Sequence, residues 1–174
     1  PAKGFNYVYR INCGGPEYTD TYQNKWEADR SVPNGNTKNW GSLSWTNHFS
    51  GMPAFFASQR RTNDPIKNTK DWPLFQSFRY GREQLSYRFP LPDGEYRVEL
   101  YFNEPWLGIG GGMDARAMRL FDVAVNDKTV LQDLDIWKEA GTNAALKKVI
   151  TVEVKGGMLR LSFPNIKAGQ ALIP

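Results

Sequence analysis

The amino-acid sequence predicts an all-β sandwich, and two observations lead to this fold class. Apolar residues alternate with polar ones over many short stretches, which is the period expected of a strand with one buried face. Turn-forming residues separate these stretches at short intervals. No internal repeat and no amphipathic helix are recognisable, apart from a helical turn near Lys138 to Ala140.

The most regular part of the chain runs from Gln84 to Trp137. Within it, Pro90 to Gly94 forms a turn, because its prolines block strand pairing and its Asp-Gly pair supplies a left-handed position. The strands expected here are residues 85–89, 96–102, 121–125, 129–131 and 133–137. We expect a β-meander, interrupted by the glycine-rich loop from Pro105 to Arg119. Regular strands do not need a loop of this length, so the loop is where function is expected.

The flanking parts of the chain add further strands. These are expected at residues 7–13, 149–154, 159–163 and 170–173, with a Gly-Gly turn joining the middle two into a hairpin. Residues 17–72 differ, because they are rich in Asn, Gly, Ser, Thr and Pro and cannot form a core alone. The tryptophans of this segment, at positions 26, 40, 45 and 72, either pin loops to the sandwich or face a ligand.

Length and composition limit the functional classes. At 174 residues, the chain is expected to form one domain, residues 1–174, with a proper core. The aromatic content of 14% exceeds what such a core requires, and the formal charge of +4 favours acidic partners. Cys13 is the single cysteine, which excludes an internal disulfide. The abrupt ends at Pro1 and Pro174, each beside a strand-like stretch, suggest a domain cut from a longer protein.

Catalytic constellations are weak in this sequence. His48 is the single histidine and has no nucleophile motif beside it. Glu104 and Asp122 would approach one another if their strands were neighbours, but nothing raises them above surface acids. Zinc spacing is absent, and the glycine-rich loop lacks the following helix of a dinucleotide site. Asp133 and Asp135 are weak candidates for a structural calcium, and no other cofactor is expected.

A binding surface remains. Aromatic rings offer sugars flat apolar patches, while Arg and Asn side chains bind hydroxyls and carboxylates, and Arg grips a carboxylate in bidentate fashion. Candidates for such contacts lie in loops at the predicted strand ends, which converge at one end of a sandwich. They are Arg79, Tyr80, Trp106, Leu107, Asn165 and Lys167.

The sequence resembles malectin-type carbohydrate-binding modules over nearly its whole length. The resemblance is carried by short pieces, each mostly structural, whose order and spacing together are specific. They are Ile11-Asn-Cys13-Gly-Gly15, Arg79-Tyr80, Tyr87, Phe89-Pro-Leu-Pro, Gly94-Glu-Tyr96, Leu100-Tyr-Phe102-Asn-Glu104, Phe121-Asp-Val123, Val125-Asn126 and Asp133-Leu-Asp135-Ile136.

The resemblance implies a jelly-roll-like β-sandwich that binds glycans, without catalysis, through long loops at one end. Bacterial versions are similar to modules attached to multidomain glycoside hydrolases, which implies an extracytoplasmic location, periplasmic or at the cell surface, and covalently attached catalytic domains. A polysaccharide or oligosaccharide ligand is expected, and neither a nucleic acid nor a membrane.

The resemblance also assigns sugar contacts. The aromatic contacts of the family fall on Tyr80 and on the pair Trp106-Leu107. Its acidic contact would fall in residues 164–168, where this chain has Asn165 and Lys167. Its tyrosine in the first long loop has no clear equivalent, and Trp40 and Trp45 are the nearest substitutes.

These replacements change the expected ligand. An amide or ammonium group in place of an acid favours a uronate-containing polysaccharide such as pectin. The surrounding basic residues favour the same ligand, and they are Arg60, Arg61, Lys67, Arg79, Arg82, Arg116 and Arg119. Three alternatives stay open: a neutral glucose-type oligosaccharide, a small glycosidase or lyase, and a sandwich that binds a partner protein.

Overall fold

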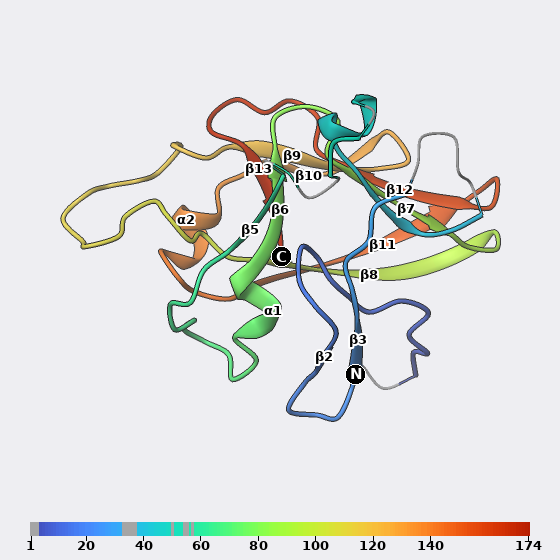
Figure 1. The fold of residues 1–174 in the computed structure, drawn as a ribbon, viewed down its shortest axis with the longest axis horizontal. Helices are drawn as coiled ribbons and strands as arrows, with labels where there is room; N and C mark the ends of the chain where they lie inside the picture. The colour runs from blue at the N-terminus through green and yellow to red at the C-terminus, as the bar shows by residue number, and fades with distance from the viewer. Residues whose placement is uncertain (1–3, 33–37, 50, 54–55, 57) are drawn as a thin grey trace.

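A computed structural model of the chain describes residues 4–32, 38–49, 51–53, 56 and 58–174. Strands dominate the described residues, which confirms the all-β prediction (Figure 1). The helices are short: α1 (Pro73–Gln76), α2 (Ile136–Ala140) and the 3-10 turn η1 (Trp45–His48). The strands are β1 (Ile11–Asn12), β2 (Tyr18–Thr19), β3 (Lys25–Ala28), β4 (Gly41–Leu43), β5 (Gln59–Arg61), β6 (Ser77–Gly81), β7 (Ser86–Pro90), β8 (Gly94–Phe102), β9 (Phe121–Val125), β10 (Lys128–Leu134), β11 (Leu146–Val154), β12 (Met158–Ser162) and β13 (Ala171–Ile173).

Two antiparallel layers enclose the main core. One is a five-stranded sheet in the order β10-β9-β12-β7-β4, and the other is the long pair β11-β8. Alternate side chains of both layers point inward, among them Tyr87, Leu100 and Val123, which are at most 5% exposed. Two three-stranded sheets, β13-β6-β5 and β1-β3-β2, complete the fold, and β1 pairs with β3 in parallel.

The predicted meander and the predicted final hairpin are wrong in their pairing. β7 pairs with β12, whereas β8 pairs with β11, so the connections β7–β8 and β11–β12 both cross between layers. The two crossings run side by side, since the Leu91 N–H donates to the Gly157 carbonyl at 3.1 Å. Leu91 is buried, and the prolines beside it cannot donate to a hairpin ladder. The chain therefore passes along the edge of the core from one layer to the other. The β9–β10 hairpin is antiparallel, as expected.

The predicted strand over residues 7–13 is mostly absent, because a ladder forms only at β1. The residues before it are held by other contacts. The Tyr9 hydroxyl donates to the Pro90 carbonyl at 2.9 Å, and the Arg10 carbonyl accepts from the Glu27 N–H at 2.7 Å. These contacts hold Tyr9 and Arg10, and among the described residues no ladder pairs this segment with β8.

The helical turn predicted at Lys138 to Ala140 begins earlier, as α2. β10 ends at Leu134, and the Asp135 carboxylate caps α2 by accepting from the Lys138 N–H at 2.9 Å. The predicted strand end at 133–137 is therefore a strand-to-helix junction. In the described part of the chain, none of the helices has the length and apolar character that crossing a bilayer requires.

Candidate functional site

β6 presents Tyr80 at one end of the sandwich. Tyr80 and Phe78 lie two residues apart on this strand and therefore share a face. Phe78 is fully buried, and its ring meets the half-buried Tyr80 ring edge-on at 6.3 Å between centroids. The buried phenylalanine thus fixes the tyrosine at the margin of the core.

Trp106 completes an aromatic corner with these two rings. Its ring stands at 89° to the Tyr80 ring with 5.9 Å between centroids, and it contacts Phe78 at 5.1 Å. The side chain is still 38% exposed. Two nearly perpendicular rings with free surface are suited to a sugar, whose apolar faces stack while its hydroxyls stay hydrated.

A buried ion pair supports this corner. Glu104 is fully buried and accepts from the Arg119 Nε at 2.5 Å and from the N–H groups of Trp106 and Leu107 at 3.1 Å each. The Arg119 guanidinium lies 5.5 Å from the Trp106 ring centroid and donates to the Gln170 carbonyl at 2.6 Å. One carboxylate and one guanidinium therefore tie together the start and the end of the glycine-rich loop and the approach to β13.

The glycine-rich loop projects from the body of the molecule, where it forms the yellow extension at the left of Figure 1. Its first glycine, Gly108, has a φ of 78°, and an added Cβ would lie 2.4 Å from the Trp137 indole nitrogen. Farther along, Ile109, Met113 and Met118 are 45–59% exposed. The loop that begins at the aromatic corner therefore displays apolar side chains to solvent.

The arginines predicted to contact the ligand are of two kinds, buried and exposed. Arg79 is 3% exposed and forms an ion pair with Asp29, and its Nη1 donates to Ser58 at 3.0 Å. Together with the buried Arg119, it stabilises the fold and does not face solvent. Arg116 is exposed, but its guanidinium donates hydrogen bonds to both carboxylate oxygens of Asp114. These hydrogen bonds lower the pKa of Asp114 to about 2.

Arg60 and Arg61 point to opposite faces of their sheet. Opposite residues of an antiparallel pair share a face, and Arg60 lies opposite Phe78 whereas Arg61 lies opposite Ser77. Both arginines are exposed. Arg60 therefore shares the face of the aromatic corner, and Arg61 does not.

The two predicted tryptophan substitutes lie elsewhere. Trp40 is 4% exposed, stacks on Phe89 at 6.2 Å between centroids and carries the Arg30 guanidinium 4.0 Å from its ring. It is a packing residue, and we remove it from the candidate site. Trp45 is half-buried in η1 and meets Phe49 edge-on, and no contact joins it to Tyr80 or Trp106 within the described residues.

Asn165 and Lys167 face the β9–β10 hairpin. The Asn165 amide donates to the Asp122 carboxylate at 3.0 Å, and Lys167 forms an ion pair with Asp133. The Asp133 N–H also donates to Asp122, and these hydrogen bonds lower the pKa of Asp122. Both side chains are exposed on the segment that runs beside Leu120, one residue after Arg119.

The acids considered for calcium or catalysis have other partners. Asp135 accepts from the N–H groups of Lys138 and Ala117, so its carboxylate is directed away from the ion pair of Asp133. No group of three potential metal ligands is present among the residues that the structure describes. Glu104 is enclosed by Arg119 and cannot reach a sugar.

Comparison with known proteins identifies the family of this fold. Residues 7–174 match the family model described as the Malectin domain. The chain belongs to the malectin-domain family. Malectin-B from Xenopus laevis is 32% identical over 93 residues, which cover 53% of this chain and 32% of that protein. The match thus spans about a third of that relative.

Two solved structures share the malectin-domain architecture. A Bacteroides uniformis β-glucuronidase superimposes with a TM-score of 0.74 at 23% identity, over 95% of this chain and 17% of that one. The ANX2 ectodomain from Arabidopsis thaliana gives a TM-score of 0.69 at 15% identity, over 95% of this chain and 47% of that one. At these identities the likeness concerns the fold.

Sequence reasoning missed how this malectin domain supports its aromatic corner. Phe78 and Gln170 were not singled out, and Glu104 was considered as a catalytic acid and as part of a family motif, but not as the partner of Arg119. A signal was present, because strand alternation places Glu104 on the inward face of Leu100 and Phe102. A carboxylate on an inward face requires a buried cation, and Arg119 is that cation.

Proposed function

We propose that this malectin domain is a non-catalytic carbohydrate-binding module that holds a polysaccharide at the Tyr80–Trp106 corner. The proposal rests on the perpendicular pair of rings. The Trp106 ring is partly exposed and is supported from below by the buried ion pair of Glu104 and Arg119. Such a surface recognises sugar faces, and Glu104, the acid that supports it, is buried and paired with Arg119.

We propose a uronate-containing, pectin-like glycan as the ligand. Arg60 is exposed on the face of the aromatic corner, and a guanidinium grips a carboxylate in bidentate fashion. Arg79 and Arg119 do not contribute to this preference, because both are buried in ion pairs. The selectivity for an acidic sugar therefore rests mainly on Arg60.

The β-glucuronidase neighbour supports a parent protein that is a glycoside hydrolase, in which residues 1–174 form one malectin-like domain. In that arrangement the module holds the enzyme on its polysaccharide. The ectodomain neighbour supports an extracytoplasmic location.

Affinity gel electrophoresis tests the proposed function. The domain is run through gels that contain pectin, polygalacturonate or a neutral glucan, at low and at high salt. Retardation by the uronate polymers that salt relieves is expected, because exposed ion pairs are screened at high ionic strength. Retardation by the neutral glucan at both salt concentrations would instead support a neutral ligand. An absence of retardation in every gel would reject the proposal.

Trp106→Ala is expected to weaken polysaccharide binding at least tenfold. Covering the exposed 38% of this residue removes roughly 100 Å² from water, which contributes about 2 kcal/mol. The fold should survive, because the ring lies at the margin of the core. Affinity in gels measures the effect, and the folded Trp40→Phe variant, which changes a tryptophan packed against Phe89, is the control. Unchanged affinity of Trp106→Ala would remove the corner from the site.

Arg60→Ala is expected to weaken binding of polygalacturonate and to flatten its salt dependence, whereas Arg61→Ala should leave both unchanged. The two variants remove the same charge from neighbouring positions, and only Arg60 shares the face of Phe78. Titration of oligogalacturonate at two salt concentrations compares them. Equal losses in both variants would show a diffuse effect of net charge and no specific contact.

Protein binding is a second candidate function, favoured by one observation. Ile109, Met113 and Met118 are exposed on the projecting loop, and exposed apolar patches commonly mark contacts between domains. If no glycan retards the domain, binding between this domain and its neighbours in the full-length protein becomes the next measurement.

A further inference from the structure

A cavity of about 320 Å³ lies along the free edge of β8, on a different part of the surface from Trp106. It touches seven consecutive residues of β8, from Glu95 to Tyr101, and seven consecutive residues of the segment from Phe5 to Ile11. Consecutive strand residues point to opposite faces, so a cavity that touches all of them runs along the strand edge. Its volume lies within the range of small-molecule sites.

The cavity exists because β8 is paired on one side only. β11 bonds one edge of β8 over nine residue pairs, and no ladder covers the other edge within the described residues. Residues 7–10 have the alternation of a strand but are anchored to Pro90 and Glu27, as described above. The gap between these two segments is the cavity.

The inner walls of the cavity are apolar. Among them, Cys13 is a neutral thiol, because burial, with the nearby Asp29 charge, raises its pKa to about 12. The other inner side chains belong to the main core or pack against it, and they include Tyr87, Phe89, Leu100, Leu159 and Leu161. A wall of this kind accepts an aliphatic or aromatic group and excludes a charged one.

An open groove of about 520 Å³ adjoins the cavity on the outer face of β8 and β11. Its floor is aromatic, because Trp26 and Phe75 both meet the Tyr101 ring edge-on, at 5.5 and 5.7 Å between centroids. The β2–β3 hairpin forms one wall and places Tyr22, which is 78% exposed, in the lining. Such a floor with an exposed ring beside it suits a sugar.

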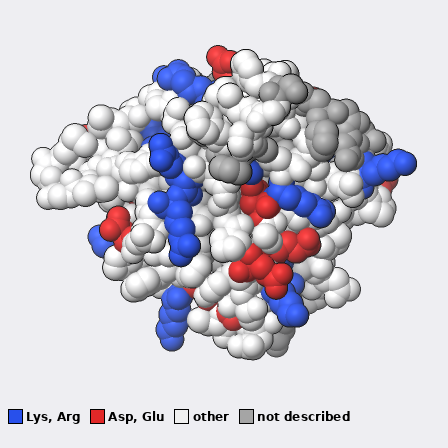
Figure 2. All heavy atoms as spheres, in the orientation of Figure 1, with Lys and Arg blue, Asp and Glu red and all other residues white. Residues whose placement is uncertain are grey.

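The polar lining of the groove is balanced in charge. Three carboxylates face it, from Asp20, Asp71 and Glu99, and three cations do so, from Arg10, Arg97 and Lys147. Figure 2 shows the same mixture on this side of the molecule, with acidic side chains gathered near β3 and basic ones beside them. The groove therefore favours a neutral ligand over an anion or a cation.

Hydrogen-bonding capacity remains in the groove. The Asp71 carboxylate accepts from Tyr18 and twice from Thr21, which uses three of its roughly four acceptor positions. Lys147 and Arg97 each bind Glu99 and keep further N–H donors, with side chains 44% and 32% exposed. Acceptors and donors beside an aromatic floor match the hydroxyls of a sugar.

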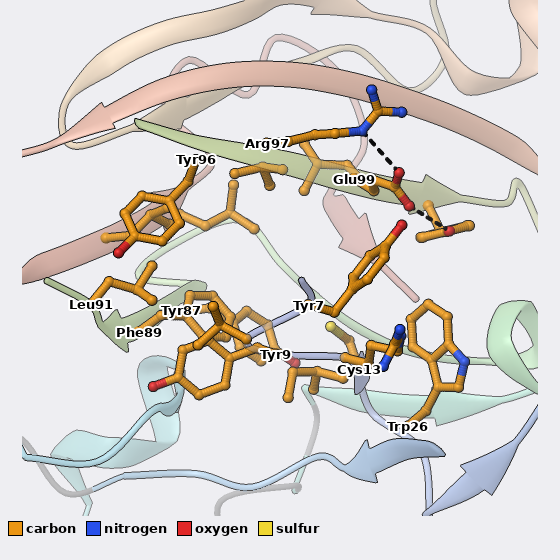
Figure 3. A pocket seen from close by; sticks show the side chains of 18 of the residues that line it. Tyr7, Tyr9, Cys13, Trp26, Tyr87, Phe89, Leu91, Tyr96, Arg97 and Glu99 are labelled. Carbon is orange, nitrogen blue, oxygen red and sulfur yellow. Dashed lines mark hydrogen bonds and ion pairs between the residues drawn. The ribbon is translucent and has the colours of Figure 1, made fainter. Parts of the chain in front are cut away.

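The groove and the cavity meet at shared residues. Figure 3 shows Tyr7 and Trp26 at the end of the cavity near Glu99, with Leu91 and Tyr96 at the opposite end. The lining residues common to both are Tyr7, Arg10, Trp26, Arg97, Glu99 and Tyr101. We propose that the two together bind one neutral glycoside that carries an apolar aglycone, with the sugar in the groove and the aglycone in the cavity.

Isothermal titration with octyl β-D-glucoside and octyl β-D-galactoside, below their micellar concentrations, tests this proposal. At least one of them is expected to bind tenfold or more tightly than the corresponding methyl glycoside, because the octyl chain enters the cavity. Octanol should bind more weakly than the octyl glycoside, because it lacks the sugar. Failure of both octyl glycosides to exceed their methyl counterparts would overturn the proposal.

Two variants locate the binding. Val98→Trp fills the cavity from the inward face of β8 and should abolish the octyl advantage, while Tyr22→Ala should weaken every glycoside at least threefold without altering the fold. Thermal unfolding checks that Val98→Trp is folded, and Val98→Phe replaces it if it is not. Octyl binding that survives both the filled cavity and Tyr22→Ala would overturn the proposal.

Trp106→Ala separates this site from the polysaccharide site. Neither the cavity nor the groove has Tyr80 or Trp106 in its lining, so octyl glycoside binding should be unchanged in that variant. Loss of binding there would place the glycoside at the aromatic corner and overturn the proposal. Cosedimentation with phosphatidylcholine vesicles containing a monoglucosyl diacylglycerol distinguishes the sources: binding identifies a membrane glycolipid as the ligand, and its absence identifies a free glycoside.

Discussion

Replacing Glu104 with glutamine is expected to lower the free energy of unfolding by about 3–5 kcal/mol and to weaken polysaccharide binding at least tenfold. The amide keeps an oxygen for the N–H groups of Trp106 and Leu107 but no longer neutralises Arg119, which is 5% exposed. A buried guanidinium without its carboxylate must hydrate or move, and either change disturbs the Trp106 ring above it. Urea denaturation gives the stability, and gel affinity gives the binding.

Two control variants separate the effect of the uncompensated charge from the effect of the altered side-chain contacts. In the double variant Glu104→Gln with Arg119→Met, no uncompensated charge remains, so most of the stability should return. Binding should recover less, because methionine cannot hold Gln170 or support Trp106 as the guanidinium does. The exposed pair of Arg116 and Asp114 provides the second control, and Arg116→Ala should leave stability unchanged. A stability loss as small in Glu104→Gln as in Arg116→Ala would show that the buried pair contributes little.

Much of this fold could be predicted because strand alternation and turn chemistry are local signals. β9 and β13 lie where the alternation placed them, whereas β10 joins the stretch expected at 129–131 to the start of the stretch expected at 133–137. The partners of the strands were not predictable in the same way. The turn sequence at Pro90 to Gly94 is compatible both with a hairpin and with a connection that crosses between the two layers. The structure has the crossing, in which Leu91 is buried. Whether a turn residue is buried depends on strands that are distant in sequence, so the local sequence pattern does not indicate it.

The candidate site was likewise predictable in part. Tyr80 and Trp106 were identified from sequence, and the structure brings their rings together. The arginines were less predictable, because their residue type does not reveal a buried carboxylate partner 50 residues away, as Asp29 is for Arg79. The cavity beside β8 was not predictable either, since the alternation of residues 7–13 indicates a strand that would have filled it.

Arg79 carries the second large effect, and Arg79→Leu is expected to cost about 3–5 kcal/mol of unfolding free energy. Its guanidinium joins β6 to the segment after β3, since Nε donates to the Asp29 carboxylate at 2.7 Å and Nη2 donates to Ser31 at 3.3 Å. Asp29 also accepts from the Tyr87 hydroxyl at 2.6 Å, and its side chain is 2% exposed. Leucine would leave this carboxylate buried, with the Tyr87 hydroxyl as its remaining side-chain partner among the described residues.

Arg79→Lys is the sharper test of the same network. An ammonium keeps the charge but cannot reach Asp29, Ser31 and Ser58 together, because it lacks the planar fork of the guanidinium. Its stability should therefore fall between those of the wild type and Arg79→Leu, as measured by urea denaturation. Lysine as stable as arginine would mean that charge alone matters. Glycan affinity of the folded Arg79→Lys variant should stay unchanged, because Arg79 lies on the opposite face of β6 from Tyr80 and contributes through the fold.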